Sequence, residues 1–130
     1  GNWGGTGTGA IGASSGSCSF EVAIQGHALL RRSINESQAG RHEDIMLIYG
    51  TPAGLRATYA DMEEHAINYT VTVTTEPRGA VFLSDEIPGA PRFRLTHHLL
   101  PDGSLNTIFA MAPPGSSEFK TYVEGAMKRR

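Results

Sequence analysis

Hydrophobic and polar side chains alternate in several short segments of the chain. In residues 66–74, one isoleucine, one tyrosine and two valines alternate with one asparagine and three threonines. The same period of two recurs in residues 17–25 and in residues 105–111. Successive side chains of an extended strand point to opposite faces of a sheet, so this pattern predicts β-strands with one buried face.

Turn-forming residues separate these segments at intervals of 10 to 15 residues. Thr51–Gly54 and Glu76–Gly79 both place Pro second and Gly fourth, which favours a type I turn. Short connections favour antiparallel pairing of strands in sequence order, and closure of the sheet removes its two free edges. We therefore expect an all-β fold, a single antiparallel up-and-down β-barrel of about nine to ten strands, formed by residues 1–130 as a single domain.

The segment after Pro113-Pro114-Gly115 follows a different pattern. Ser116 or Ser117 is a suitable N-cap for a helix that would run to about Lys128. Apolar residues then recur at the spacing i, i+3, i+4 and i+7, on Phe119, Tyr122, Val123 and Ala126. The sequence thus predicts one C-terminal α-helix that packs on the barrel or covers one of its ends.

Composition excludes several classes of function. The chain has 11 Lys and Arg against 13 Asp and Glu residues, a formal net charge of −2, so it lacks the basic surface of a nucleic-acid-binding protein. Its apolar runs are too short for a membrane span. No signal peptide is visible, and we expect a cytoplasmic location. The single cysteine, Cys18, excludes an internal disulfide and is expected to be a small core residue. The sequence leaves open whether the chain forms a homodimer.

Two clusters of acidic residues and histidine are candidate metal sites. Residues 42–44 read His-Glu-Asp, and residues 61–65 contain Asp61, Glu63, Glu64 and His65. Neither segment pairs its histidine with a second histidine or a cysteine at a spacing typical of a metal site. We expect a solvated turn at residues 61–65 and no metal ion at either place.

The segment of residues 92–99 offers two candidate linings for the barrel. One face carries Arg92, Arg94, Thr96 and His98, and the other carries Phe93, Leu95, His97 and Leu99. If the polar face is interior, Arg94 and His98 form a cluster that can bind a carboxylate. If the apolar face is interior, His97 is a single polar group in the lumen. We favour the second arrangement.

A barrel of this strand number can hold one small ligand among its apolar side chains. We expect a small, largely apolar ligand: a fatty acid, a related carboxylate or another hydrophobic metabolite. The residues expected to contact it are His97, Arg94, Tyr59, Tyr69, Arg31, Phe20, Phe109 and Met111.

The two ends of the chain carry a resemblance to a known family. The chain opens with a Gly-x-Trp-x-Gly-x-Gly-x-Gly string over residues 1–9, and residues 92–125 contain Arg-Phe-Arg-Leu-Thr, Asp-Gly-Ser-Leu, Ala-Met-Ala-Pro-Pro-Gly and Tyr-Val-Glu-Gly. Together these segments resemble the calycin-type, lipocalin-like β-barrels of the fatty-acid-binding-protein and nitrobindin-like group, with their uncharacterised bacterial relatives. The resemblance implies a ligand-binding barrel.

The same resemblance implies two alternatives to simple binding. In nitrobindin-like barrels a C-terminal histidine binds haem, and Tyr122 stands at the corresponding position here. Tyrosine can hold haem iron, but we expect Tyr122 to be a core residue and expect no cofactor. Some lipocalin-like barrels are small cofactor-free enzymes, for which His97 would be the general acid or base with Tyr69 or Tyr59 as its partner.

Overall fold

The computed structural model describes residues 1–10 and 12–130. Ten strands and one short 3₁₀ turn, Ile24–Gly26, make up its regular structure. The strands are β1 (Asn2–Gly9), β2 (Ser14–Ala23), β3 (Ala28–Ser37), β4 (Gly40–Thr51), β5 (Gly54–Asp61), β6 (Ala66–Thr75), β7 (Arg78–Ser84), β8 (Arg92–Leu99), β9 (Leu105–Ala112) and β10 (Lys120–Arg129).

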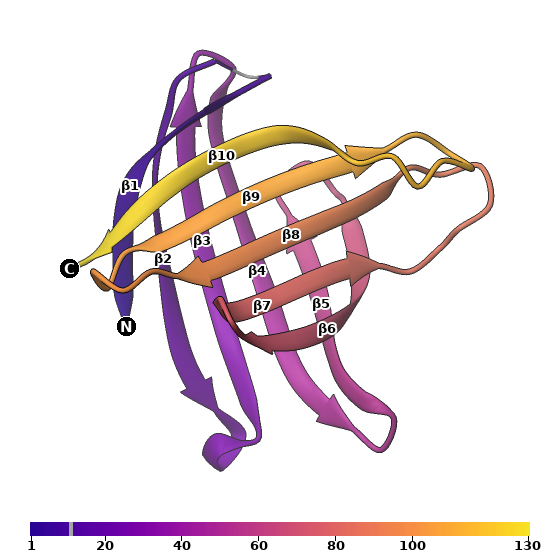
Figure 1. The fold of residues 1–130 in the computed structure, drawn as a ribbon, viewed down its shortest axis with the longest axis horizontal. Coiled ribbons are helices and arrows are strands. Elements are labelled where there is room, and N and C mark those ends of the chain that lie inside the picture. Colours follow the sequence, from indigo (N-terminus) through magenta and orange to yellow (C-terminus); the bar gives the residue numbers. More distant parts are fainter. Residues whose placement is uncertain (11) are drawn as a thin grey trace.

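The strands form one closed antiparallel barrel. Each strand pairs with its neighbours in sequence, and β1 pairs with β10 to complete the ring. Figure 1 shows β10, in yellow, beside β1, in indigo, with both chain ends on the same side of the molecule. Closure leaves no strand of the ring with an unpaired edge. The all-β, up-and-down barrel expected from the sequence is confirmed.

The prediction of a C-terminal helix is wrong, because residues Lys120–Arg129 form strand β10. The segment also fits a strand, because Val123, Gly125 and Met127 are half-buried on one face, whereas Ala126 of the helical pattern is exposed. A register shift between Thr121 and Val123 displaces Tyr122 from the regular alternation. As a strand, the segment hydrogen-bonds both β1 and β9, whereas a helix would leave both edges unpaired. None of the described residues belongs to a helix long and apolar enough to cross a membrane.

Glycines bring β1 and β10 unusually close together. A Cβ atom on Gly5 would overlap the carbonyl oxygen of Ala126. A Cβ atom on Gly125 would lie 2.6 Å from the carbonyl oxygen of Thr6. Each glycine therefore occupies a place where the backbone of the opposite strand leaves no room for a side chain. The Gly-rich start of the sequence has its structural use here, where the sheet closes on itself.

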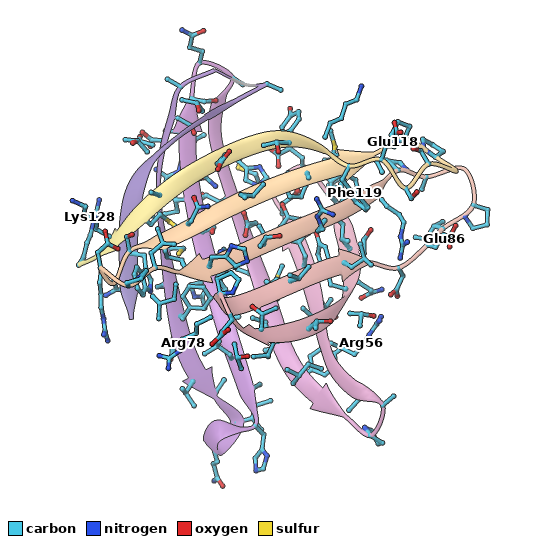
Figure 2. The ribbon with its side chains drawn as sticks, in the orientation of Figure 1. Arg56, Arg78, Glu86, Glu118, Phe119 and Lys128 are labelled. Carbon is cyan, nitrogen blue, oxygen red and sulfur yellow. The ribbon has the colours of Figure 1, made fainter. Side chains whose placement is uncertain are left out.

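The apolar faces of the strands point into the barrel. The main cluster of buried core residues is Met46, Ala57, Tyr69, Val71, Phe82 and Leu95. Leu95 and His97 of β8 are both buried, so the apolar face of this strand is the interior one, in agreement with the favoured arrangement. Arg94 lies on the outer face, where its guanidinium carbon is 4.5 Å from the centre of the Phe119 ring. Figure 2 labels Phe119 beside the start of β8 and the end of β9.

Cys18 is a buried core residue, as expected. Only 5% of its surface is exposed, and its Sγ lies 3.7 Å from Sδ of Met127 on β10. Burial raises the pKa of the Cys18 thiol to about 11. The thiol is therefore protonated at neutral pH and poorly suited to act as a nucleophile.

Candidate functional site

The interior of the barrel opens into a cavity of about 450 Å³ at one end. This cavity end holds both chain termini and the connections at residues 24–27, 52–53, 76–77 and 100–104. Apolar side chains from strands all around the ring form its walls, among them Phe20, Leu29, Ile48, Val71, Phe82 and Leu99. Among the described residues that line it, His97 alone has a titratable side chain. The volume and the apolar walls are typical of a site for a small organic molecule.

Exposed apolar side chains surround the mouth of the cavity. Val22 and Ile24 are each 67% exposed and Val73 is 63% exposed, although all three are hydrophobic. Leu55 and Leu100 add to this set. Several exposed apolar residues gathered in one region often mark a binding site. An apolar molecule therefore meets apolar side chains at the mouth as well as inside the cavity.

His97 marks the polar end of the cavity. Its Nδ1 lies 2.8 Å from Oγ1 of Thr107, and its Nε2 lies 3.5 Å from Nη1 of Arg31. Burial, together with the positive charge of Arg31, lowers the pKa of His97 to about 3. The ring is therefore neutral at pH 7. Because Arg31 can only donate, Nε2 is the acceptor and Nδ1 carries the proton towards Thr107.

Arg31 is held in the barrel interior by an ion pair with Asp44. Nη2 of Arg31 lies 2.5 Å from Oδ1 of Asp44, and the two side chains are 7% and 6% exposed. The carboxylate compensates the positive charge, which a buried guanidinium requires. Nε of Arg31 is a buried donor that has no hydrogen-bond partner among the described residues.

Further contacts extend from Asp44 to the opposite end of the barrel, which holds the connections at residues 38–39, 62–65, 85–91 and 113–119. Oδ2 of Asp44 lies 3.3 Å from Nε2 of His42. The same nitrogen lies 3.1 Å from the hydroxyl of Tyr59. Contacts among His97, Arg31, Asp44 and His42 thus run from the cavity through the interior to the opposite end.

The eight residues expected to contact a ligand lie in several different environments. His97 and Phe20 line the cavity, and Arg31 contacts His97. Tyr69, which is 2% exposed, belongs to the core, where its ring meets Phe82 edge to face. These four side chains lie in or directly beside the cavity.

The other four lie away from the cavity. Tyr59 contacts His42 and Asp61 at the opposite end, and burial raises its pKa. Phe109 stacks on Phe93, with ring centres 5.8 Å apart. Met111 pairs with Lys120 and Phe93 in the sheet. Arg94 is on the outer face, because β8 presents its apolar face to the interior. The prediction that Arg94 contacts a ligand inside the barrel is therefore wrong.

Asp44 and Thr107 are parts of the polar cluster that sequence reasoning missed. The β3–β4 hairpin pairs Arg31 with Met46 and Ser33 with Asp44. Arg31 and Asp44 are thus diagonal neighbours on one face of the sheet, within reach of long side chains. Counting this register outward from the turn at residues 38–39 would have placed the carboxylate beside the guanidinium.

The residues present do not fit a haem held by Tyr122. The Tyr122 ring meets Phe109 edge to face, with ring centres 6.2 Å apart. Tyr122 is not among the residues that line the cavity, which lies at the other end of the barrel. The tyrosine and the cavity therefore do not form one site.

Comparisons with known proteins show the fold and nothing finer. No protein-family model matches the chain. No curated protein matches it either. Among solved structures, a similar chain is described as a "De novo design of a fluorescence-activating beta barrel", with a TM-score of 0.53 and 13% sequence identity. The match covers 100% of this chain and 92% of the designed one. The chain shares the closed antiparallel β-barrel of that design, and no family match supports the more specific resemblance to calycins.

Proposed function

We propose that the barrel binds one small, largely apolar molecule in the cavity of about 450 Å³. The observation that carries this proposal is an apolar cavity with one neutral polar group, His97, at its inner end. Apolar walls supply the affinity, and one or two placed polar groups orient the ligand. The designed barrel of similar fold is described as fluorescence-activating, which is consistent with ligand binding by this architecture in general.

The charge balance of the site favours an uncharged ligand over a carboxylate. Asp44 already compensates the positive charge of Arg31, and burial keeps His97 neutral. A fatty-acid carboxylate would therefore be buried without a free cation, which is costly. A neutral hydroxyl or carbonyl group brings no charge into the interior, so its burial costs less. We thus place neutral apolar molecules ahead of fatty acids.

His97 is poorly suited to the alternative role of an acid–base catalyst. A general base works best with a pKa near the working pH, whereas burial and Arg31 hold the pKa of His97 at about 3. Its hydrogen-bonding neighbours are Thr107 and Arg31 rather than a tyrosine. Binding without chemistry is the function that this arrangement supports best.

Binding of the neutral dye N-phenyl-1-naphthylamine, followed by its fluorescence, tests the proposal. We expect a saturable signal with one site per barrel. Leu29→Trp should weaken binding about tenfold or more, equivalent to 1.4 kcal/mol, because Leu29 lines the cavity. Leu30→Trp is the matched control, since the neighbouring residue of a strand points to the other face. No saturable binding, or equal binding by both variants, would overturn the proposal.

Competition with two ligands of equal chain length tests the preference for a neutral head group. Dodecanol should displace the dye at a lower concentration than dodecanoate at pH 7.5. The expected difference is about tenfold or more, since the carboxylate must lose its hydration without gaining an unpaired cation. Tighter binding of dodecanoate would show that Arg31 remains available to an anion.

A further inference from the structure

A cluster of metal-ligating side chains lies at the end of the barrel opposite the cavity. His42, Asp61 and Glu63 each present one ligand atom, and these atoms lie within 4.8 Å of one another. His42 stands near the start of β4, Asp61 ends β5, and Glu63 belongs to the turn that follows. The register of β4 and β5, which pairs Asp44 with Asp61, brings the three residues together. Neither sequence segment carries this set alone.

His42 lies between two carboxylates. Its Nδ1 is 2.7 Å from Oε2 of Glu63, and its Nε2 is 3.3 Å from Oδ2 of Asp44. Both of these partners are carboxylates, which attract a cation. A divalent cation that binds the ring competes with a proton for the same nitrogen. The geometry thus places an imidazole nitrogen and a carboxylate oxygen side by side, as two ligands of one ion require.

Asp61 is fixed in place by hydrogen bonds to its carboxylate. Oδ1 accepts the backbone N–H groups of Glu63 and His65, at 2.9 and 3.0 Å. Oδ2 accepts the hydroxyl of Tyr59 at 2.9 Å and lies 2.9 Å from Nδ1 of His65. Burial raises the pKa of Asp61, but the hydrogen bonds from His65 and Tyr59 outweigh it, so the pKa is lower than usual. Outer hydrogen bonds of this kind orient the ligands of a metal ion.

We propose that His42, Asp61 and Glu63 bind a divalent transition metal ion such as Zn²⁺. Imidazole and carboxylate groups are both known ligands of zinc. Zinc bonds of about 2.0–2.2 Å place two ligands of a tetrahedral ion about 3.4 Å apart, so these three ligand atoms, which lie within 4.8 Å of one another, need only small shifts. Glu63 lies at Nδ1 of His42, which assigns this nitrogen to the ion and leaves Nε2 to Asp44 and Tyr59.

Solvent reaches this cluster directly. The side chains of His42, Glu63 and His65 are 33%, 44% and 66% exposed, whereas those of Asp44 and Asp61 are 6% and 3% exposed. Buried carboxylates therefore form the inner side of the site, and more exposed side chains form its outer side. The site does not depend on the apolar ligand proposed above, because the cavity opens at the other end of the barrel.

Calorimetric titration with ZnCl₂ tests the proposal on protein treated with a chelator and desalted. We expect one equivalent of zinc to bind. His42→Gln and Glu63→Gln should each weaken binding at least about tenfold, the effect seen when even an outer hydrogen-bond partner is lost. The matched controls are Glu64→Gln, next to Glu63 in the same turn, and His27→Gln, exposed at the cavity end. Both should bind zinc as the parent protein does.

Thermal unfolding of each variant separates loss of the site from loss of the fold. Glu63 is exposed, so its variant keeps the fold and carries the test if His42→Gln does not. Binding of N-phenyl-1-naphthylamine should be unchanged in Glu63→Gln, which distinguishes this site from the cavity. The proposal is overturned if zinc does not bind the parent protein saturably, or if Glu63→Gln and Glu64→Gln bind it equally.

Discussion

Arg31 shows how a single charged residue is accommodated in the core of this barrel. The guanidinium contacts Asp44 on one side and His97 on the other. Its charge holds the buried carboxylate and, together with burial as the larger cause, lowers the pKa of His97 so that the ring is neutral. The properties of the cavity's polar end therefore depend on this pair rather than on His97 alone.

Removing one charge of the Arg31–Asp44 pair should lower the free energy of unfolding more than replacing both residues with apolar ones. We expect Asp44→Asn to lower the free energy of unfolding by about 3–5 kcal/mol, because Arg31 remains buried without its counter-charge. The double variant Arg31→Met, Asp44→Leu should lose much less, since no buried charge is left. Urea unfolding of both proteins gives the comparison. A double variant that is less stable than Asp44→Asn would contradict this account.

Neutral His97 should make the barrel less stable in acid. The folded protein holds the pKa of His97 at about 3, against 6.5 for an ordinary histidine. Between these values the unfolded chain binds the extra proton and the folded one does not, so stability falls as the pH falls. Below pH 6 the loss attributable to His97 should approach about 1 kcal/mol per pH unit.

The variant His97→Gln isolates this contribution. Glutamine can still hydrogen-bond Thr107 but does not titrate. The free energy of unfolding of the variant should therefore change less between pH 7 and pH 4 than that of the parent protein. Urea unfolding at several pH values gives the two slopes. Equal slopes would contradict this account, because they would mean that His97 takes up a proton as readily in the folded protein as in the unfolded chain.

At the scale of elements, β10 is decided by its neighbours more than by its own sequence. Residues 119–126 have apolar side chains at a spacing that fits a helix, yet the segment pairs with β1 and β9. Both flanking strands need a partner for their backbone groups, and a strand in this position satisfies them. Pairing on both sides outweighs the local preference, which is worth a fraction of a kcal/mol per residue.

A methyl group at Gly125 should weaken the β1–β10 pairing. The new Cβ atom would lie 2.6 Å from the carbonyl oxygen of Thr6, and backbone must shift to make room. We expect Gly125→Ala to lower the free energy of unfolding by about 1–3 kcal/mol, a typical cost of such overpacking. Gly50→Ala in β4 is the control, because nothing lies within 4 Å of its Cβ position. Similar losses in urea unfolding for both variants would contradict the importance of close approach.

At the scale of the whole molecule, the sequence was sufficient for the barrel because its signal is repeated. Alternation in segments such as residues 66–74 and regular turns predict strands and their order without any long-range information. The prediction for the C-terminal segment was wrong because its sequence fits both a helix and a strand. Which of the two forms depends on β1, which lies at the other end of the sequence.

The functional residues were harder to predict because they depend on register. Alternation placed Phe20 in the lumen, and for residues 92–99 it left two faces open, of which the one with His97 was favoured. The partnership of Arg31 with Asp44, and that of His42 with Glu63, arises between strands. A shift of one residue in either hairpin would turn one partner to the outer face, so composition and spacing within one segment carry no signal for these pairs.

The pairing of β1 with β10 also has a kinetic consequence. Every other pair of strands joins neighbours in sequence and can form as a local hairpin, but Trp3 must find Arg129 across nearly the whole chain. Closure of so long a loop is slow because of its entropy. If the local hairpins form before closure, the chain is then an open sheet with two free edges, and the same edges on a second copy can pair with them. We therefore expect a higher protein concentration during refolding to favour pairing between copies over closure of the ring.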